Sequence, residues 1–176
     1  SYTNQIMSQM EPDYIQIGNE INTGILFPSG DIQNNSIQFI ELLNQGVNAV
    51  RSNSNITKII LHFAGYDGSQ WFFNLVDQVD YDIIGISYYP IWHGKSLDEL
   101  QIELTELSDN FEKEILIAET AYPFTLGWND WTNNIIGLEE QLILPDYPAT
   151  PNGQQSFIRN LKSLIFDINN GIGFCY

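Results

Sequence analysis

Short apolar runs alternate with longer amphipathic segments along the whole chain. The runs have the length of buried strands, and we predict strands at 14–17, 58–63, 83–87, 115–118 and 172–176. Each run is nearly all apolar, which is typical of a strand that is covered on both faces of a parallel sheet.

The segments between these runs repeat their apolar residues at helical spacing. One predicted face comprises Ile37, Ile40, Leu43, Val47 and Val50. The other two comprise Leu97, Leu100, Leu104, Leu107 and Phe111, and Phe157, Leu161, Leu164 and Ile168. A capping box at 96–99 precedes the second helix. Strands that alternate with helices predict an α/β fold, either a doubly wound sheet or part of a (β/α)8 barrel. No glycine-rich phosphate loop follows a strand, which weakens the nucleotide-binding versions.

Polar residues stand where the predicted strands end. The first run is followed by Asn19 and Glu20, the second ends at His62, the third leads into Tyr89, and the fourth ends at Glu119. Catalytic groups of a (β/α)8 barrel come from the C-terminal ends of several strands, because that rim is open to substrate. We therefore expect Glu20 and Glu119 to lie at the rim.

A pair of carboxyl groups is the minimal set for glycoside hydrolysis. A separation of about 5–5.5 Å predicts retention of configuration, and about 6.5–9.5 Å predicts inversion. Asn19, beside Glu20, could bond a sugar hydroxyl, and Tyr89 could donate its hydroxyl to the Glu119 carboxylate. One glutamate after a strand is more often a cap or a loop anchor, so the combination of these residues carries the interpretation.

Composition and charge limit the classes of partner that we expect for this chain. The chain of 176 residues has the length of one domain, and its 6 Lys and Arg face 22 Asp and Glu, for a formal charge of −16. Such a charge repels nucleic acid and anionic lipid, so we expect no nucleic-acid or membrane partner and a neutral substrate. Cys175 is the single cysteine, and two histidines are too few for a histidine-built zinc centre, so we predict no metal site. No signal peptide or membrane-spanning run is visible.

Three segments resemble the signatures of glycoside hydrolase family 53, the endo-β-1,4-galactanases of clan A. They are "IGNEINTGILFPSG" at 17–30, "GISYYPIWHG" at 85–94 and "IAETAYPFTLGWNDW" at 117–131. The resemblance implies a (β/α)8 barrel that cleaves β-1,4-galactosidic bonds in the galactan and arabinogalactan side chains of pectin, with retention. It also implies a secreted, periplasmic or cell-surface parent that requires no cofactor.

By matching position, the resemblance makes Glu20 the general acid/base and Glu119 the nucleophile. It makes Asn19 the partner of the sugar 2-hydroxyl and Tyr89 the residue that orients the nucleophile. Trp92 and His93 would line the sugar-binding groove; an indole face suits the apolar C–H face of a sugar. These assignments add a substrate-binding set to the carboxylate pair.

The long segment from 122 to 153 lacks a helical period, and loops of this length usually have a function. We expect it to form a wall of the substrate cleft and to include Trp128. Some family members bind a structural calcium ion in this region. Here Asn129 and Asp130 offer oxygen ligands without a dense acidic cluster, so calcium is left open.

The resemblance aligns the first predicted strand with the fourth strand of the family. We therefore expect residues 1–176 to be a single C-terminal fragment with strands 4 to 8, without the arginine that strand two would supply to the nucleophile. Such a fragment should be weakly active or inactive alone. The alternatives are another clan A glycanase, acting on mannan, xylan or cellulose, and a non-catalytic carbohydrate-binding fragment.

Overall fold

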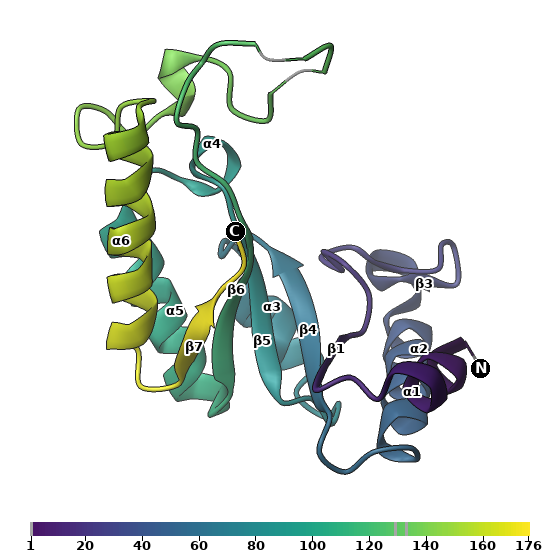
Figure 1. Cartoon of the computed structure of the whole chain (residues 1–176). Helices are drawn as coiled ribbons and strands as arrows, with labels where there is room; N and C mark the ends of the chain where they lie inside the picture. The colour runs from purple at the N-terminus through teal and green to yellow at the C-terminus, as the bar shows by residue number, and fades with distance from the viewer. Residues whose placement is uncertain (1, 129, 133) are drawn as a thin grey trace. The chain divides into compact units, whose positions relative to one another are not determined.

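The computed structural model of the protein describes residues 2–128, 130–132 and 134–176. Figure 1 shows the ribbon of the whole chain, which divides into two compact units. Each unit buries its own set of apolar side chains. Unit 1 comprises Ser1–Ala64 with Gly68–Gly85, and unit 2 comprises Gly65–Asp67 with Ile86–Tyr176.

Five strands form the main sheet, in the order β1-β4-β5-β6-β7. Their bounds are β1 (Tyr14–Gln16), β4 (Lys58–Ala64), β5 (Ile83–Tyr88), β6 (Glu114–Thr120) and β7 (Gly171–Phe174). All five predicted strands are confirmed. The order follows the chain without a reversal, whereas a doubly wound sheet reverses at its switch point. Of the two architectures that the sequence left open, the sheet is therefore that of part of a (β/α)8 barrel.

Burial differs between the middle and the ends of this strand order. The side chains of β4 and β5 are buried almost throughout, as predicted for strands covered on both faces. Those of β1 and β7 are only half-buried or exposed, so the prediction of two-sided cover is wrong for these two strands. An end strand has one strand neighbour instead of two, and less of its surface is covered.

Unit 1 adds three helices and a small hairpin to its strands. These are α1 (Tyr2–Met10), α2 (Ile32–Arg51), α3 (Ser69–Leu75) and the antiparallel pair β2 (Gly24–Ile25) and β3 (Gly30–Asp31). Helix α1 lies beside α2 (Figure 1). Asp31 caps α2, because its Oδ1 accepts a hydrogen bond from the Gln33 backbone N–H at 2.9 Å.

The apolar face of α2 differs from the predicted one at its start. Asn35 has non-helical backbone angles, φ −140° and ψ 47°, and kinks the helix there. Phe39 is fully buried, whereas Ile37 is 76% exposed, so the prediction that Ile37 belongs to the core is wrong. The buried residues after the kink are Phe39, Leu43, Val47 and Val50. Ile37 lies two positions before Phe39 and therefore nearly on the opposite side of the helix.

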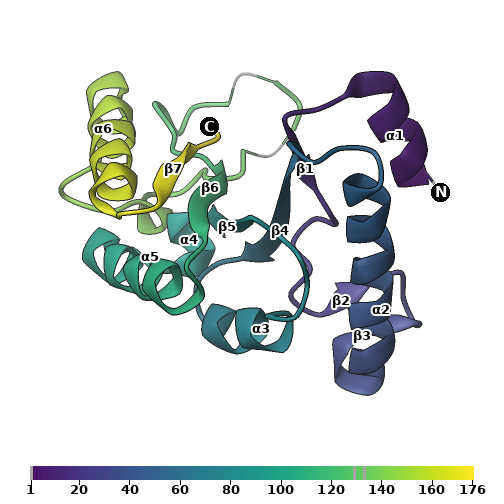
Figure 2. The ribbon, with the colours of Figure 1, turned by 90° about the horizontal axis from the view of Figure 1, so that it is seen from below.

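Unit 2 contains the helices α4 (Pro90–His93), α5 (Leu97–Phe111) and α6 (Pro151–Asp167) and the short 3₁₀ helix η1 (Glu139–Gln141). Ser96 caps α5 as predicted, since its Oγ accepts from the Glu99 N–H at 3.1 Å. Helices α5 and α6 lie side by side next to β6 and β7 (Figure 2).

Tyr122 fixes the irregular segment that follows β6. Its ring stacks on Phe157 of α6 with centroids 4.3 Å apart. Its hydroxyl donates to the Tyr147 carbonyl at 2.6 Å and accepts from the Ile143 N–H at 2.9 Å. The buried Tyr122 side chain thus joins the start of this segment to residues 143 and 147 and to α6.

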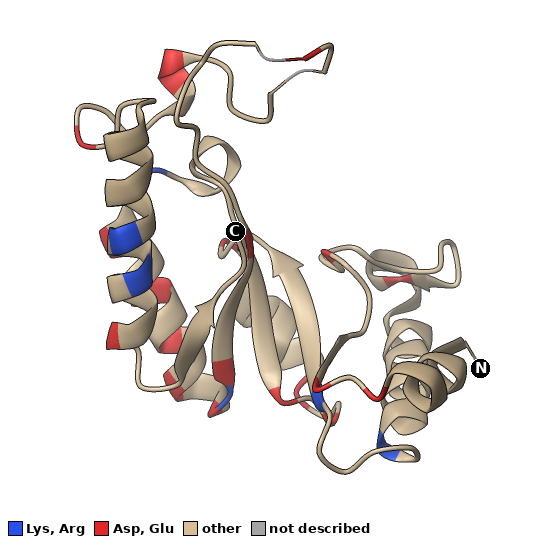
Figure 3. Ribbon diagram, viewed as in Figure 1, with Lys and Arg blue, Asp and Glu red and all other residues tan. Residues whose placement is uncertain are grey.

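Acidic positions outnumber basic ones on the ribbons of both units, as the 22 Asp and Glu against 6 Lys and Arg require (Figure 3). This distribution disfavours an anionic ligand. Among the helices of residues 2–128, 130–132 and 134–176, none combines the length and apolar character needed to cross a membrane.

Candidate active site

The loop after β1 is bound along β4. The Ile17 N–H donates to the Ile60 carbonyl at 3.0 Å, and the Ile21 N–H donates to the His62 carbonyl at 2.9 Å. Asn22 then clamps the end of β4: its Nδ2 donates to the Ala64 carbonyl at 2.9 Å, and its Oδ1 accepts from the Ala64 N–H at 2.7 Å. The loop therefore follows β4 to its C-terminal end and carries Glu20 there.

Glu20 itself has a left-handed backbone conformation, with φ 48°. For a residue with a side chain this conformation costs about 1–2 kcal/mol. The buried Ile21 and the clamp of Asn22 on Ala64 hold the backbone on the C-terminal side of Glu20 in place. Strain of this kind occurs at functional residues, where the surrounding contacts offset it.

His62 is fully buried within β4 and contacts the residue before Glu20. Its Nδ1 lies 3.2 Å from Asn19 Oδ1, which also accepts from Gln16 Nε2 at 3.0 Å. An amide oxygen only accepts, so Nδ1 of His62 carries the proton, and Nε2 of the neutral ring is an acceptor. Both bonds use the oxygen of Asn19, which leaves its amide N–H groups for other partners.

A nitrogen of the His62 ring and a carboxylate oxygen of Glu20 lie within 4.8 Å of each other. The sequence showed His62 at a strand end without indicating a role. The signal was a polar residue inside an otherwise apolar run, but its partner Asn19 lies 43 positions away in the sequence. Only the folded chain joins these side chains.

In unit 2, Glu119 is the penultimate residue of β6 and Tyr89 directly follows β5. The Tyr89 hydroxyl donates to Glu119 Oε2 at 3.1 Å, which is the hydrogen bond that the sequence predicted. This hydrogen bond fixes the orientation of the Glu119 carboxylate.

Helix α4 places an aromatic pair beside Tyr89. The Trp92 ring meets the Tyr89 ring edge-on with centroids 5.2 Å apart, and Trp92 remains 60% exposed. The Tyr89 N–H donates to His93 Nδ1 at 3.0 Å, so the proton of the neutral His93 ring is on Nε2. A Cβ on Gly65 would lie 2.8 Å from the His93 ring, and φ of 76° at Gly65 also favours glycine. The sequence-predicted residues Tyr89, Trp92, His93 and Glu119 thus lie together in unit 2.

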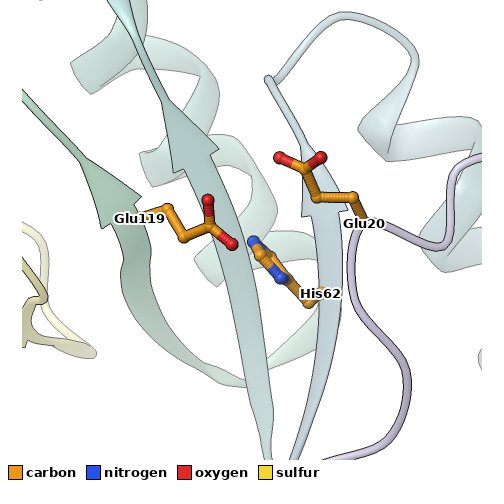
Figure 4. A group of neighbouring side chains, drawn as sticks. All are labelled: Glu20, His62 and Glu119. Carbon is orange, nitrogen blue, oxygen red and sulfur yellow. The ribbon is translucent and has the colours of Figure 1, made fainter. Parts of the chain in front are cut away.

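Figure 4 draws the side chains of Glu20, of His62 and of Glu119, which come from the loop after β1, from β4 and from the end of β6. Within unit 1, Glu20 and His62 offer one carboxylate oxygen and one ring nitrogen.

The segment after β6 forms a pocket of about 260 Å³ whose lining includes Phe124, Ile135 and Gln154. Trp128, predicted to bind substrate, is 64% exposed and is not part of that lining. Asn129, a candidate calcium ligand, lies outside the described residues. Asp130 Oδ1 accepts from the Thr132 hydroxyl and N–H at 2.7 and 2.8 Å, and these bonds hold the pKa of Asp130 below its usual value.

The sequential parallel sheet, with polar groups at its strand ends, defines a protein of the (β/α)8-barrel class. The model of glycosyl hydrolase family 53 matches residues 1–176, and the chain belongs to this family.

The similarity of this chain to known proteins is consistent with membership of family 53. The arabinogalactan endo-β-1,4-galactanase of Cellvibrio japonicus is 36% identical over 178 residues, covering 96% of this chain and 46% of that protein. The endo-β-1,4-galactanase of Bacillus subtilis is 29% identical, covering 99% of this chain and 42% of that protein. The family 53 catalytic domain of Ignisphaera aggregans superimposes with a TM-score of 0.88 at 35% identity, covering 98% of this chain and 51% of that domain. The chain thus spans about half the length of these relatives.

Proposed function

We propose that this chain carries the two catalytic carboxylates of a retaining endo-β-1,4-galactanase. The observation that carries the proposal is the family 53 match over residues 1–176, together with Glu20 and Glu119 on segments at the C-terminal ends of strands. The names of the Cellvibrio and Bacillus relatives support galactan as the substrate. The formal charge of −16 is consistent with a neutral polysaccharide.

The chemistry assigns a different step to each carboxylate. Glu20 protonates the glycosidic oxygen as the bond breaks, while Glu119 attacks the anomeric carbon and forms a galactosyl-enzyme ester. Glu20 then takes a proton from water, which attacks the same carbon and releases Glu119 with net retention. This sequence requires the two carboxyl groups to face each other across the bond at about 5–5.5 Å.

The neighbouring side chains fit supporting roles. Asn19 presents amide N–H groups for the sugar 2-hydroxyl, since His62 and Gln16 occupy its oxygen. Tyr89 orients Glu119 through its hydroxyl. We assign Trp92 to stacking on a galactose face and the Nε2–H of His93 to a sugar oxygen. Trp128, on the exposed segment after β6, would extend this surface.

We further propose that residues 1–176 are the C-terminal half of one catalytic domain. The chain covers 42–51% of the length of the relatives described above. A closed barrel of about 250 residues needs eight strands, and the main sheet here has five. We expect weak or no turnover by this chain alone, no cofactor requirement, and a whole protein that acts outside the cell, where pectin is found.

The test replaces each of the two glutamates by alanine in a protein that has the complete barrel. The substrate is an aryl β-1,4-galactobioside. We expect Glu119→Ala to lower kcat by several orders of magnitude, because no second nucleophile is available. Azide fills the space that each deleted carboxylate leaves, and its products distinguish the roles. Glu119→Ala should yield the α-galactobiosyl azide by a single displacement of the aryl group, and Glu20→Ala the β-galactobiosyl azide from the ester.

Glu106→Ala, on the exposed face of α5, is the matched control and should retain full turnover. Unchanged turnover in the Glu20 or Glu119 variant would remove that residue from the mechanism. Exchanged azide products would reverse the two roles.

A further inference from the structure

Unit 1 has a pocket of about 400 Å³ that the proposed mechanism does not use. Its size falls within the range of about 300–1,000 Å³ that is typical of small-ligand pockets. Asn22 and Thr23, two and three residues after Glu20, form part of its wall, so the pocket lies beside the loop that carries Glu20.

Trp71 supplies an exposed aromatic face in this pocket. It belongs to α3, where the neighbouring Phe72 and Phe73 are fully buried in the core of unit 1. Trp71 instead is 59% exposed, and its pocket neighbours include the apolar Ile32 and Leu75. An indole that stays in water keeps an unburied apolar face, which a ligand with an apolar C–H face can cover.

The remaining lining residues offer hydrogen bonds. Asp31 Oδ1 accepts from the Gln33 N–H and Oδ2 from Asn34 Nδ2, and each oxygen retains further acceptor capacity. The side chains of Gln33 and Ser36 add amide and hydroxyl groups to the same wall. Among the described lining residues Asp31 carries the one charge, which is negative, so an anionic ligand is disfavoured. A neutral polyol with one apolar face fits this combination.

We propose that this pocket is a subsite for a neutral hexosyl unit of the polysaccharide, with the sugar ring stacked on Trp71 and its hydroxyls bonded to Asp31 and Gln33. The proposal rests on the function proposed above and adds a contact remote from the bond that is cleaved. Because Asn22 and Thr23 place the pocket next to the loop of Glu20, we expect the subsite to contribute to the affinity for longer substrates.

Binding to the full chain, residues 1–176, tests the subsite without requiring turnover. Each tryptophan contributes one indole N–H signal to a ¹H–¹⁵N spectrum, and the signal of Trp71 is assigned by its loss in Trp71→Phe. We expect β-1,4-galactotetraose at millimolar concentration to shift this signal, and Trp71→Ala to raise Kd about tenfold. Trp71→Phe retains a ring and should lose less affinity. Trp131→Ala removes a fully exposed indole in unit 2 and is the matched control.

The outcomes separate this proposal from the proposed function. A Trp71-dependent response to mannotetraose or cellotetraose, without one to galactotetraose, would support the subsite and contradict galactan as the substrate. An unmoved Trp71 signal with all three oligosaccharides, or equal affinity in Trp71→Ala and the native chain, would overturn the subsite. The azide experiment on Glu20 and Glu119 would be unaffected by that result. If Trp71→Ala fails to fold, the signal in the native chain and the affinity of Trp71→Phe still decide the matter.

Discussion

Replacing Asn22 by alanine should loosen the loop that carries Glu20. The substitution removes the two hydrogen bonds, of 2.9 and 2.7 Å, that join its side-chain amide to the backbone of Ala64. Each bond contributes about 0.5–1.5 kcal/mol net, which gives about 1–3 kcal/mol for the pair. Ala64 is only half-buried, so water replaces part of the loss, and we expect about 2 kcal/mol. The strained backbone of Glu20 then loses one of the contacts that hold it.

Urea unfolding of the chain measures the free-energy change, and amide hydrogen exchange locates it. The Ala64 N–H donates to Asn22 Oδ1 and should exchange faster in the variant, whereas amides in the middle of β5 should change only by the global loss. Asn34→Ala is the matched control, because its exposed amide donates to the side chain of Asp31, and we expect a change within about 0.5 kcal/mol. Equal stability and equal Ala64 protection in the Asn22 variant would refute the clamp.

Two further predictions concern single atoms. Long-range ¹H–¹⁵N spectra above the titration range of the rings should show His62 with its proton on Nδ1 and His93 with its proton on Nε2. His62 Nδ1 faces an amide oxygen, whereas His93 Nδ1 accepts the Tyr89 N–H; the reverse pattern in either ring would contradict the assigned network. Thr120→Val should raise the free energy of unfolding by about 1 kcal/mol and with it the urea midpoint, because Thr120 Oγ1 is buried without a hydrogen-bond partner among the described residues. A lower midpoint would indicate that this hydroxyl has a partner.

Local pattern was sufficient for the elements and for part of the candidate site. The apolar runs predicted all five strands, and Ser96 marked the start of α5. The hydrogen bond between Tyr89 and Glu119 could be predicted because Glu119 ends one predicted strand and Tyr89 follows another. Neighbouring parallel strands end at the same edge of a sheet. These features depend on the spacing of residues along the chain, and that spacing can be read from the sequence.

Tertiary structure alone decided which residues share an environment. The buried face of α2 passes through Phe39 and leaves Ile37 exposed, and position in the sheet order left β1 and β7 less covered than β4 and β5. His62 meets Asn19 across 43 positions, Asn22 meets Ala64 across 42, and Trp71 joins Asp31 in one pocket. The order of residues determined what each segment becomes, because periodicity and capping act within a few residues. Packing determined the partners, because hydrogen bonds and buried contacts depend on proximity in space, which no short stretch of sequence contains.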